Sequence, residues 1–137
     1  MNQENTEAYT LHSPIGLELE SVIQTIEEDG QTLVHCLYIS TNKYLFGGWV
    51  NIWPSTYLVD AESGEKIGMI QAFQIPLSPQ KHFFQCAGQI KRFTLLFPRL
   101  PQSWKRFHFV EYTTTGNGFE VKDIMRNNSG VYQIEVK

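Results

Sequence analysis

Hydrophobic and polar residues alternate with a period of two along most of this chain, and clusters of Gly, Pro, Asn and Asp interrupt the alternation at short intervals. A period of two indicates β-strands, because successive side chains of a strand point to opposite faces. The first such segment spans residues 17–23. The segment 32–40 is apolar on both faces, which is typical of a central strand covered on both sides. Helices are hard to place anywhere in the sequence.

Turn-forming residues divide the rest of the chain into further short strands. They are predicted at 49–53, 56–60, 66–73, 93–97, 107–111, 119–123 and 130–136. Pro54 ends the first of these, and the next two form a hairpin with a Gly-containing loop. The prolines within 75–79 predict an irregular connection. Eight or nine strands at this spacing predict an all-β domain made of two antiparallel sheets, because a single open sheet leaves one apolar face in water.

Composition supports one folded domain. The chain has 137 residues, of which 42% are hydrophobic and 18% charged, so it is long enough for a core of its own and unlike a disordered segment. Residues 1–14 are predicted to be a polar tail and residues 15–137 a single β-sandwich domain.

Charge and hydropathy exclude some classes of function. The net charge of −3 offers no chain-wide positive field for nucleic acid. Apolar runs are far shorter than the roughly 20 residues that span a bilayer, so no membrane span is expected. The polar start of the chain has no secretory signal. The sequence as it stands predicts a cytoplasmic location, or a periplasmic or cell-surface one if a leader was removed.

The segment 93–101, Phe-Thr-Leu-Leu-Phe-Pro-Arg-Leu-Pro, carries a resemblance. Together with 107–111 and 119–124, and with 53–60 and 75–77 upstream, it resembles uncharacterised immunoglobulin-like β-sandwich domains that are common in gut Bacteroidetes proteins. Asp123-Ile124 stands where those domains usually have Gly-Ile, and they normally end before a strand such as the one at 130–136. The resemblance implies an immunoglobulin-like sandwich and mostly exported relatives, but no particular chemistry.

Residues with catalytic or metal-binding chemistry are scattered. The four histidines lack zinc-site spacing, and Gly47-Gly48 lacks the Lys and the helix of a phosphate-binding loop. We therefore expect no enzyme activity, no cofactor and no metal. His35 is predicted to be a core residue bonded to backbone, and Glu111 to bond turn amides rather than to act as an acid or base.

The two cysteines, Cys36 and Cys86, are fifty positions apart. A disulfide between them would stabilise the fold by roughly 4 kcal/mol. A reducing compartment would keep both as thiols. Without a signal peptide, thiols are favoured.

The most suggestive cluster is aromatic. Trp49, Asn51 and Trp53 are alternate residues of one predicted strand, so their side chains point to the same face, and Tyr57 is close by in the sequence. If this face is exposed, its rings could stack on a sugar while the amide of Asn51 binds the hydroxyl groups. The alternative, which we favour, is that this face packs into the core. Trp104 follows a proline-rich connector and is either an exposed anchor for a partner or a lid over the end of the sandwich.

Two hypotheses of function follow. The first is a non-enzymatic β-sandwich interaction module that binds a partner protein or self-associates, recognisable by an exposed apolar patch or an unpaired sheet edge. The second is a carbohydrate-binding module that uses exposed aromatic residues. Trp49, Asn51, Trp53, Tyr57 and Trp104 are the candidate contacts.

Overall fold

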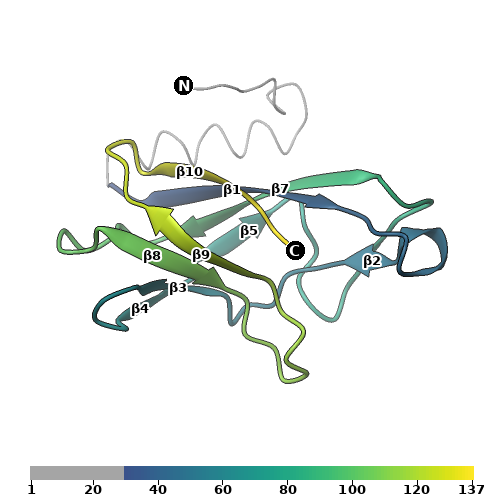
Figure 1. Ribbon diagram of the computed structural model, residues 1–137, viewed down its shortest axis with the longest axis horizontal. Helices are drawn as coiled ribbons and strands as arrows, with labels where there is room; N and C mark the ends of the chain where they lie inside the picture. The colour runs from purple at the N-terminus through teal and green to yellow at the C-terminus, as the bar shows by residue number, and fades with distance from the viewer. Residues whose placement is uncertain (1–29) are drawn as a thin grey trace.

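The computed structural model describes residues 30–137, so the predicted tail at 1–14 and the predicted strand at 17–23 lie outside the described residues. The described part is all-β (Figure 1). Its elements are β1 (Thr32–Ile39), the 3-10 turn η2 (Leu45–Gly47), β2 (Trp49–Val50), β3 (Tyr57–Asp60), β4 (Lys66–Gly68), β5 (Gln71–Phe73), β6 (His82–Phe83), β7 (Ile90–Phe97), β8 (Arg106–Val110), β9 (Glu120–Met125) and β10 (Val131–Glu135). Two four-stranded sheets have the orders β10-β1-β7-β5 and β4-β3-β8-β9, and β2 pairs with β6 in a small third sheet.

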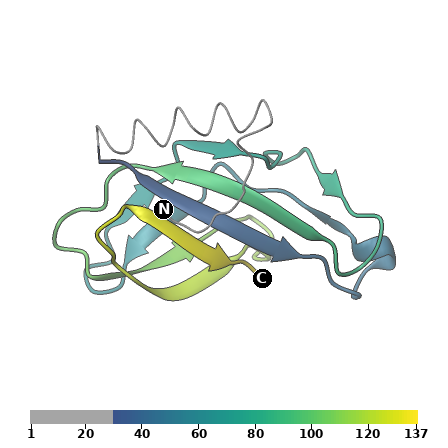
Figure 2. The ribbon, with the colours of Figure 1, turned by 90° about the horizontal axis from the view of Figure 1, so that it is seen from above.

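The two larger sheets share one core. Phe93 and Phe97 of β7 and Phe107 and Phe109 of β8 enter it without solvent exposure. Phe107 meets Tyr132 of β10 edge to face, with ring centroids 5.1 Å apart. The two sheets therefore bury apolar residues in one shared core. Figure 2 looks down onto the sheet that contains β1, β7 and β10.

β1 is a central strand, as predicted. It pairs antiparallel with β7 on one side and parallel with β10 on the other. Val34 and Cys36 point into the core, and Leu33, on the opposite parity, is also fully buried. Apolar residues at both odd and even positions thus correspond to a strand whose two faces are both covered near its start.

One pair departs from the predicted antiparallel pattern. β10 runs parallel to β1, from Leu33 opposite Val131 to Leu37 opposite Glu135. β9 lies in the other sheet, and the turn that follows it delivers the chain to the end at which β1 starts, where the Leu33 N–H donates to the Gly130 carbonyl at 2.8 Å. Strand direction is therefore set by the crossing between sheets, which an alternating pattern does not record.

The predicted strand at 66–73 is two strands in two sheets. β4 completes the predicted hairpin with β3, whereas β5 pairs with β7. The chain changes sheet between them: the Met69 N–H donates to the Thr56 carbonyl at 2.9 Å, and the Ile70 N–H to the Leu96 carbonyl at 2.7 Å. The alternation continues through this point, so the pattern predicted one strand.

β9 carries a bulge opposite β8. The register shifts between Phe107 and Phe109, so that two residues of β9 stand opposite His108 alone. Asp123, in the bulge, has a φ of 61°. Its backbone N–H donates to His108 Nδ1 at 3.0 Å, which satisfies a donor that the ladder leaves unpaired. The predicted alternation over 119–123 breaks at this bulge.

Candidate functional site

The side chains predicted to form a platform at 49–57 are not brought onto one exposed face. Trp49 is 46% exposed, whereas Asn51 is buried and its side-chain N–H donates to the Gln80 carbonyl at 2.9 Å. Trp53 is half-buried, and Tyr57 belongs to β3 in another sheet.

Core packing, the favoured alternative for this face, is wrong for Trp49. Val50 and Ile52, on the other parity, are the core residues of this segment. The regular strand ends at Val50, and Ile52 forms only an isolated bridge to Leu77, so strict alternation does not extend over 49–53.

Trp104 is fully buried and is therefore not an exposed anchor. Its ring packs against Phe107 with centroids 6.3 Å apart, and its indole N–H donates to the Glu65 carboxylate at 3.2 Å. It closes the end of the core where β7 ends and β8 begins, which is the lid role that its place in the sequence also suggested.

Glu111 binds backbone amides, one at the end of the turn that follows it, as predicted, and one in the distant loop that holds Trp53. Its two carboxylate oxygens accept the N–H groups of Trp53 and Phe119, each at 3.0 Å. Burial raises the pKa of this carboxyl, and the two hydrogen bonds offset part of that effect. Both oxygens are occupied by the fold, so the geometry gives Glu111 a structural role.

His35 bonds a side chain of the neighbouring strand. Its Nδ1 lies 2.9 Å from the Thr94 hydroxyl on β7, which supplies one partner for the ring. Burial lowers the pKa of His35 to about 4, which keeps the imidazole neutral at neutral pH.

Both cysteines are free thiols, the state that the sequence favoured. Cys36 is buried in β1, and burial raises its pKa well above the ordinary value. Cys86 is exposed in the loop between β6 and β7.

Large apolar side chains gather in the open where β1 ends and β7 begins, on the right in Figure 1. Leu45 is 82% exposed, Phe83 68% and Phe46 66%. Single exposed hydrophobic residues are ordinary on a protein surface, whereas a contiguous group marks an interaction site. We define the apolar end as Tyr44, Leu45, Phe46, Trp49, Phe83 and Ile90.

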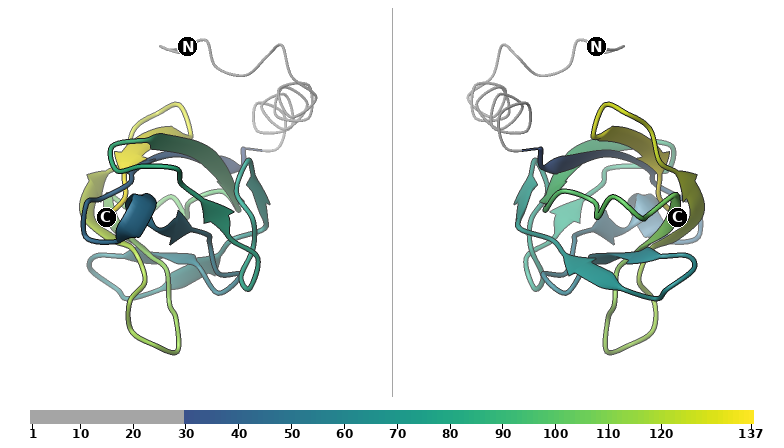
Figure 3. Two further views of the ribbon diagram at one scale, coloured as in Figure 1. Left: turned by 90° about the vertical axis from the view of Figure 1, so that its right-hand side faces the viewer. Right: turned by 90° about the vertical axis from the view of Figure 1, so that its left-hand side faces the viewer.

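Strand pairing and close approach place four of these residues next to one another, and Leu45 and Phe46 follow Tyr44 directly in the chain. Trp49 lies opposite Phe83 in the β2-β6 pair. A hollow of about 270 Å³ between β6 and the start of β7 joins Phe83 to Ile90. Tyr44 lies against Gly48, next to Trp49, because a Cβ added to this glycine would come within 3.1 Å of the Tyr44 ring. Figure 3 (left) looks onto this end, with η2 toward the viewer.

The turn η2 holds its side chains outward in an unfavourable backbone conformation. Phe46 has φ 58° and ψ 21°, in the left-handed region that bulky residues avoid. Gly47 follows with φ 86°, and a Cβ there would come within 2.6 Å of the Cys86 carbonyl oxygen. Such strain costs on the order of 1–3 kcal/mol and concentrates at functional sites.

Buried polar groups fix the loops beneath the apolar end. The Ser40 hydroxyl donates to the Cys86 carbonyl at 3.0 Å and accepts the Gln89 N–H at 2.9 Å. Asn51 holds the loop that carries Lys81 through its bond to Gln80. The exposed side chains are thus presented by a framework whose polar groups are paired.

Two lysines lie against rings of this apolar surface, in segments that hold no carboxylate. All eleven Lys and Arg residues lie within 30–137, together with only seven of the fourteen carboxylates, and no carboxylate lies within 31–59 or 66–110, the segments that build the apolar end. The Lys81 ammonium lies 4.5 Å from the Trp49 ring centroid, and that of Lys43 lies 5.9 Å from the Tyr44 centroid.

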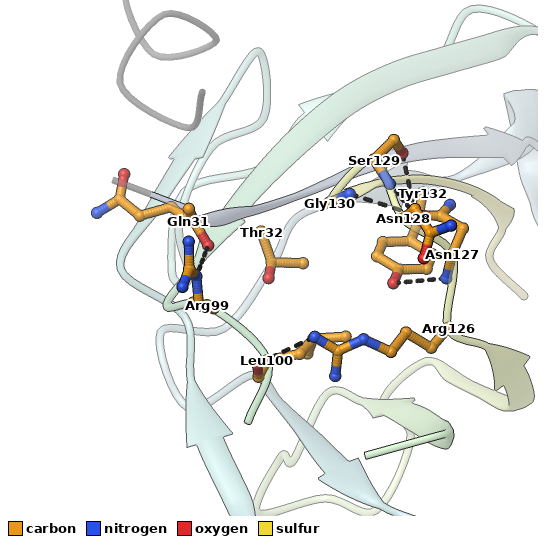
Figure 4. Close-up of a pocket in the computed structure, with 11 residues that line it drawn as sticks. Gln31, Thr32, Arg99, Leu100, Arg126, Asn127, Asn128, Ser129, Gly130 and Tyr132 are labelled. Carbon is orange, nitrogen blue, oxygen red and sulfur yellow. Dashed lines mark hydrogen bonds between the residues drawn. The ribbon is translucent and has the colours of Figure 1, made fainter. Parts of the chain in front are cut away.

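The opposite end has a polar hollow of about 340 Å³ (Figure 4). The Arg126 guanidinium donates to the Pro101 carbonyl at 2.6 Å and to the Trp104 carbonyl at 3.1 Å. The Asn127 side-chain carbonyl accepts N–H groups of the turn that precedes β10. These polar groups bind the chain itself, so this end holds the connector between β7 and β8 in place.

Two other kinds of site have no candidate in the described part of the chain. Within residues 30–137, no group of three His, Cys, Asp or Glu side chains could hold a metal ion. Across the same residues, no helix has the length and apolar character needed to cross a membrane.

Comparison of the chain with protein-family models, curated proteins and solved structures finds no match. The function is therefore inferred from the site itself.

Sequence reasoning missed most of the apolar end. It singled out Trp49 but not Leu45, Phe46 or Phe83, because these residues lie outside long alternating strands. Two signals could have found them: an apolar triplet directly before Gly47-Gly48, and the absence of carboxylates from the two long segments around it.

Proposed function

We propose that this protein is a non-enzymatic interaction module, an immunoglobulin-like sandwich that binds its partner through the apolar end. The observation that carries the proposal is the group of six large, exposed apolar side chains at one end of the molecule, on loops fixed by paired polar groups. Covering such a surface contributes about 25 cal/mol per Å² of apolar area. Loops at the ends of two-sheet folds commonly carry binding surfaces.

A carbohydrate-binding module is the less supported alternative. A sugar site needs an exposed ring with polar groups free to bind hydroxyls. Trp49 supplies an exposed ring, but Asn51 is buried and already bonded to Gln80. The neighbours of Trp49 on the surface are apolar or cationic, which suits a partner with apolar and acidic groups better than a sugar.

The test uses the full chain as bait against a total extract, membranes included, of the cells that produce it. The test variant is Leu45→Ser with Phe83→Ser, which removes apolar area from the apolar end. The matched control is Met125→Ser, because Met125 is as exposed as Phe46 but lies on β9. We expect the test variant to lose most of the bound material and the control to retain it.

Equal retention by all three proteins would contradict the proposal. Thermal unfolding of each variant checks that the fold is intact, and exposed positions of this kind are expected to change the free energy of unfolding by no more than about 0.5 kcal/mol.

A further inference from the structure

Resting on the proposed function, we infer that the partner of the apolar end is the surface of an anionic lipid bilayer. The inference comes from how apolar, aromatic and cationic side chains are arranged there, and from the charge that a partner must bring.

Two of the three most exposed residues of the apolar end form what we call its apex. Leu45 and Phe46 are consecutive on η2, at 82% and 66% exposure, and the left-handed backbone at Phe46 presents the pair on a tight projecting turn. A projecting Leu-Phe pair fits a soft layer that it can enter, since apolar side chains at an interface bury themselves at the boundary between headgroups and acyl chains.

The same surface carries aromatic rings paired with lysines. Lys43 stands over Tyr44 and Lys81 over Trp49. Tyr and Trp rings are enriched at the level of lipid headgroups, and lysine stems lie along apolar surface while their ammonium groups stay in water. The surface thus combines exposed aliphatic and phenyl groups with indole, phenol and ammonium groups, which are the kinds of side chain that a bilayer interface accommodates.

Charge selects among possible occupants. The segments 31–59 and 66–110 contribute cations but no carboxylates to this end, so a second copy of the same surface would bring like charge against it. An anionic bilayer supplies both acyl chains and negative charge, and each Lys or Arg near such a surface strengthens binding severalfold. A protein that combines apolar and acidic groups is the competing partner, which the test separates.

The experiment is sedimentation of the full chain with vesicles of phosphatidylcholine alone or of phosphatidylcholine mixed with phosphatidylserine. We expect binding to the mixed vesicles to be at least about tenfold tighter and to weaken with added salt. Trp49 serves as an internal reporter, because Trp104 is fully buried and Trp53 half-buried. Its emission should shift to the blue on binding, and brominated acyl chains should quench it.

Two variants probe the two halves of the inference. Leu45→Ser with Phe46→Ser should weaken binding by about a hundredfold, because two side chains that enter the acyl boundary are removed. Lys43→Glu with Lys81→Glu should weaken binding by about tenfold or more and remove the preference for phosphatidylserine. Met125→Ser, the control, should bind like the unaltered chain.

Absence of binding to both vesicle types, equal binding to both, or unchanged binding by the Leu45 and Phe46 variant would each overturn the lipid inference. If material is retained from the extract in a way that depends on Leu45 and Phe83 while vesicles are not bound, the interaction module stands and its partner is a protein. A soluble single-stranded oligonucleotide offers negative charge without acyl chains, so binding to it as tight as to the vesicles would also overturn the inference.

Discussion

Trp104 and Trp49 lie at opposite ends of the molecule and are used in opposite ways. Trp104 is fully buried, packs on Phe107 and donates its indole N–H to Glu65. Trp49 is 46% exposed, and its ring lies beneath an ammonium group. At one end the indole completes the core, and at the other it is left in water.

The charged side chains of the two ends also differ in whether they bond within the fold. At the end that holds the connector between β7 and β8, which we call the connector end, Arg126 donates to the carbonyls of Pro101 and Trp104, so its hydrogen bonds stabilise the fold. At the apolar end, Lys81 contacts an aromatic ring, and no ion pair to it is found within residues 30–137. The Trp104 end thus uses its aromatic ring and its guanidinium within the fold, whereas the apolar end exposes apolar side chains that gain free energy when a partner covers them.

The largest test of this comparison exchanges the two tryptophans for alanine. Trp104→Ala should lower the free energy of unfolding by about 3–5 kcal/mol, because it leaves a cavity in the core. Trp49→Ala should lower it by no more than about 0.5 kcal/mol. Urea unfolding of the two variants measures both values. Equal losses would show that the two ends do not differ in this way.

The all-β class and the central strand could be predicted from the sequence, because burial in β-sheets follows the alternation of side chains. The crossing of the chain between sheets at Met69 and Ile70 could not, since alternation continues unbroken while the hydrogen-bonding partner changes from Thr56 to Leu96. The parallel pairing of β10 escaped for a similar reason, because it depends on where β9 ends in space.

The candidate site was predictable only in part. The cluster around Trp49 drew attention to the correct segment. Strict alternation of side chains would put Asn51 on the same face as Trp49, but the regular strand ends at Val50, so the alternation does not extend to Asn51. Leu45 and Phe46 could be found only by treating apolar residues in a turn as a signal in themselves. Exposure of a turn depends on neighbouring loops that are remote in sequence, here the one holding Cys86.

A second test uses pH to act on the framework that both ends share. The folded pKa of His35 is about 4, below the ordinary value of 6.5, so between these values the unfolded chain binds a proton that the folded chain does not. Stability should therefore be full above pH 6.5 and fall as the pH drops toward 4, by at most about 3 kcal/mol from this group.

His35→Gln is the control, because it retains a polar side chain opposite Thr94 but does not titrate. Its loss of stability between pH 6.5 and 4 should be smaller than that of the unaltered chain, as measured by thermal unfolding at each pH. Parallel curves for the two proteins would remove His35 as the cause. Since β1 and β7 connect the two ends, acid should release Trp104 and the apolar end in one transition.

The smallest effect is also the most specific to the apolar end. Phe46→Gly removes an exposed side chain and replaces a strained left-handed residue by one that adopts this conformation freely, so it should raise the free energy of unfolding by about 0.5 kcal/mol. Leu45→Gly, one position earlier and without a positive φ, should lower it by about 0.5–1 kcal/mol. Opposite signs at adjacent exposed positions, measured by urea unfolding, would show that Phe46 is kept at a cost to stability. A loss of stability in Phe46→Gly would instead mean that the Phe46 ring stabilises the fold. The apolar end would then not differ from the connector end at this residue.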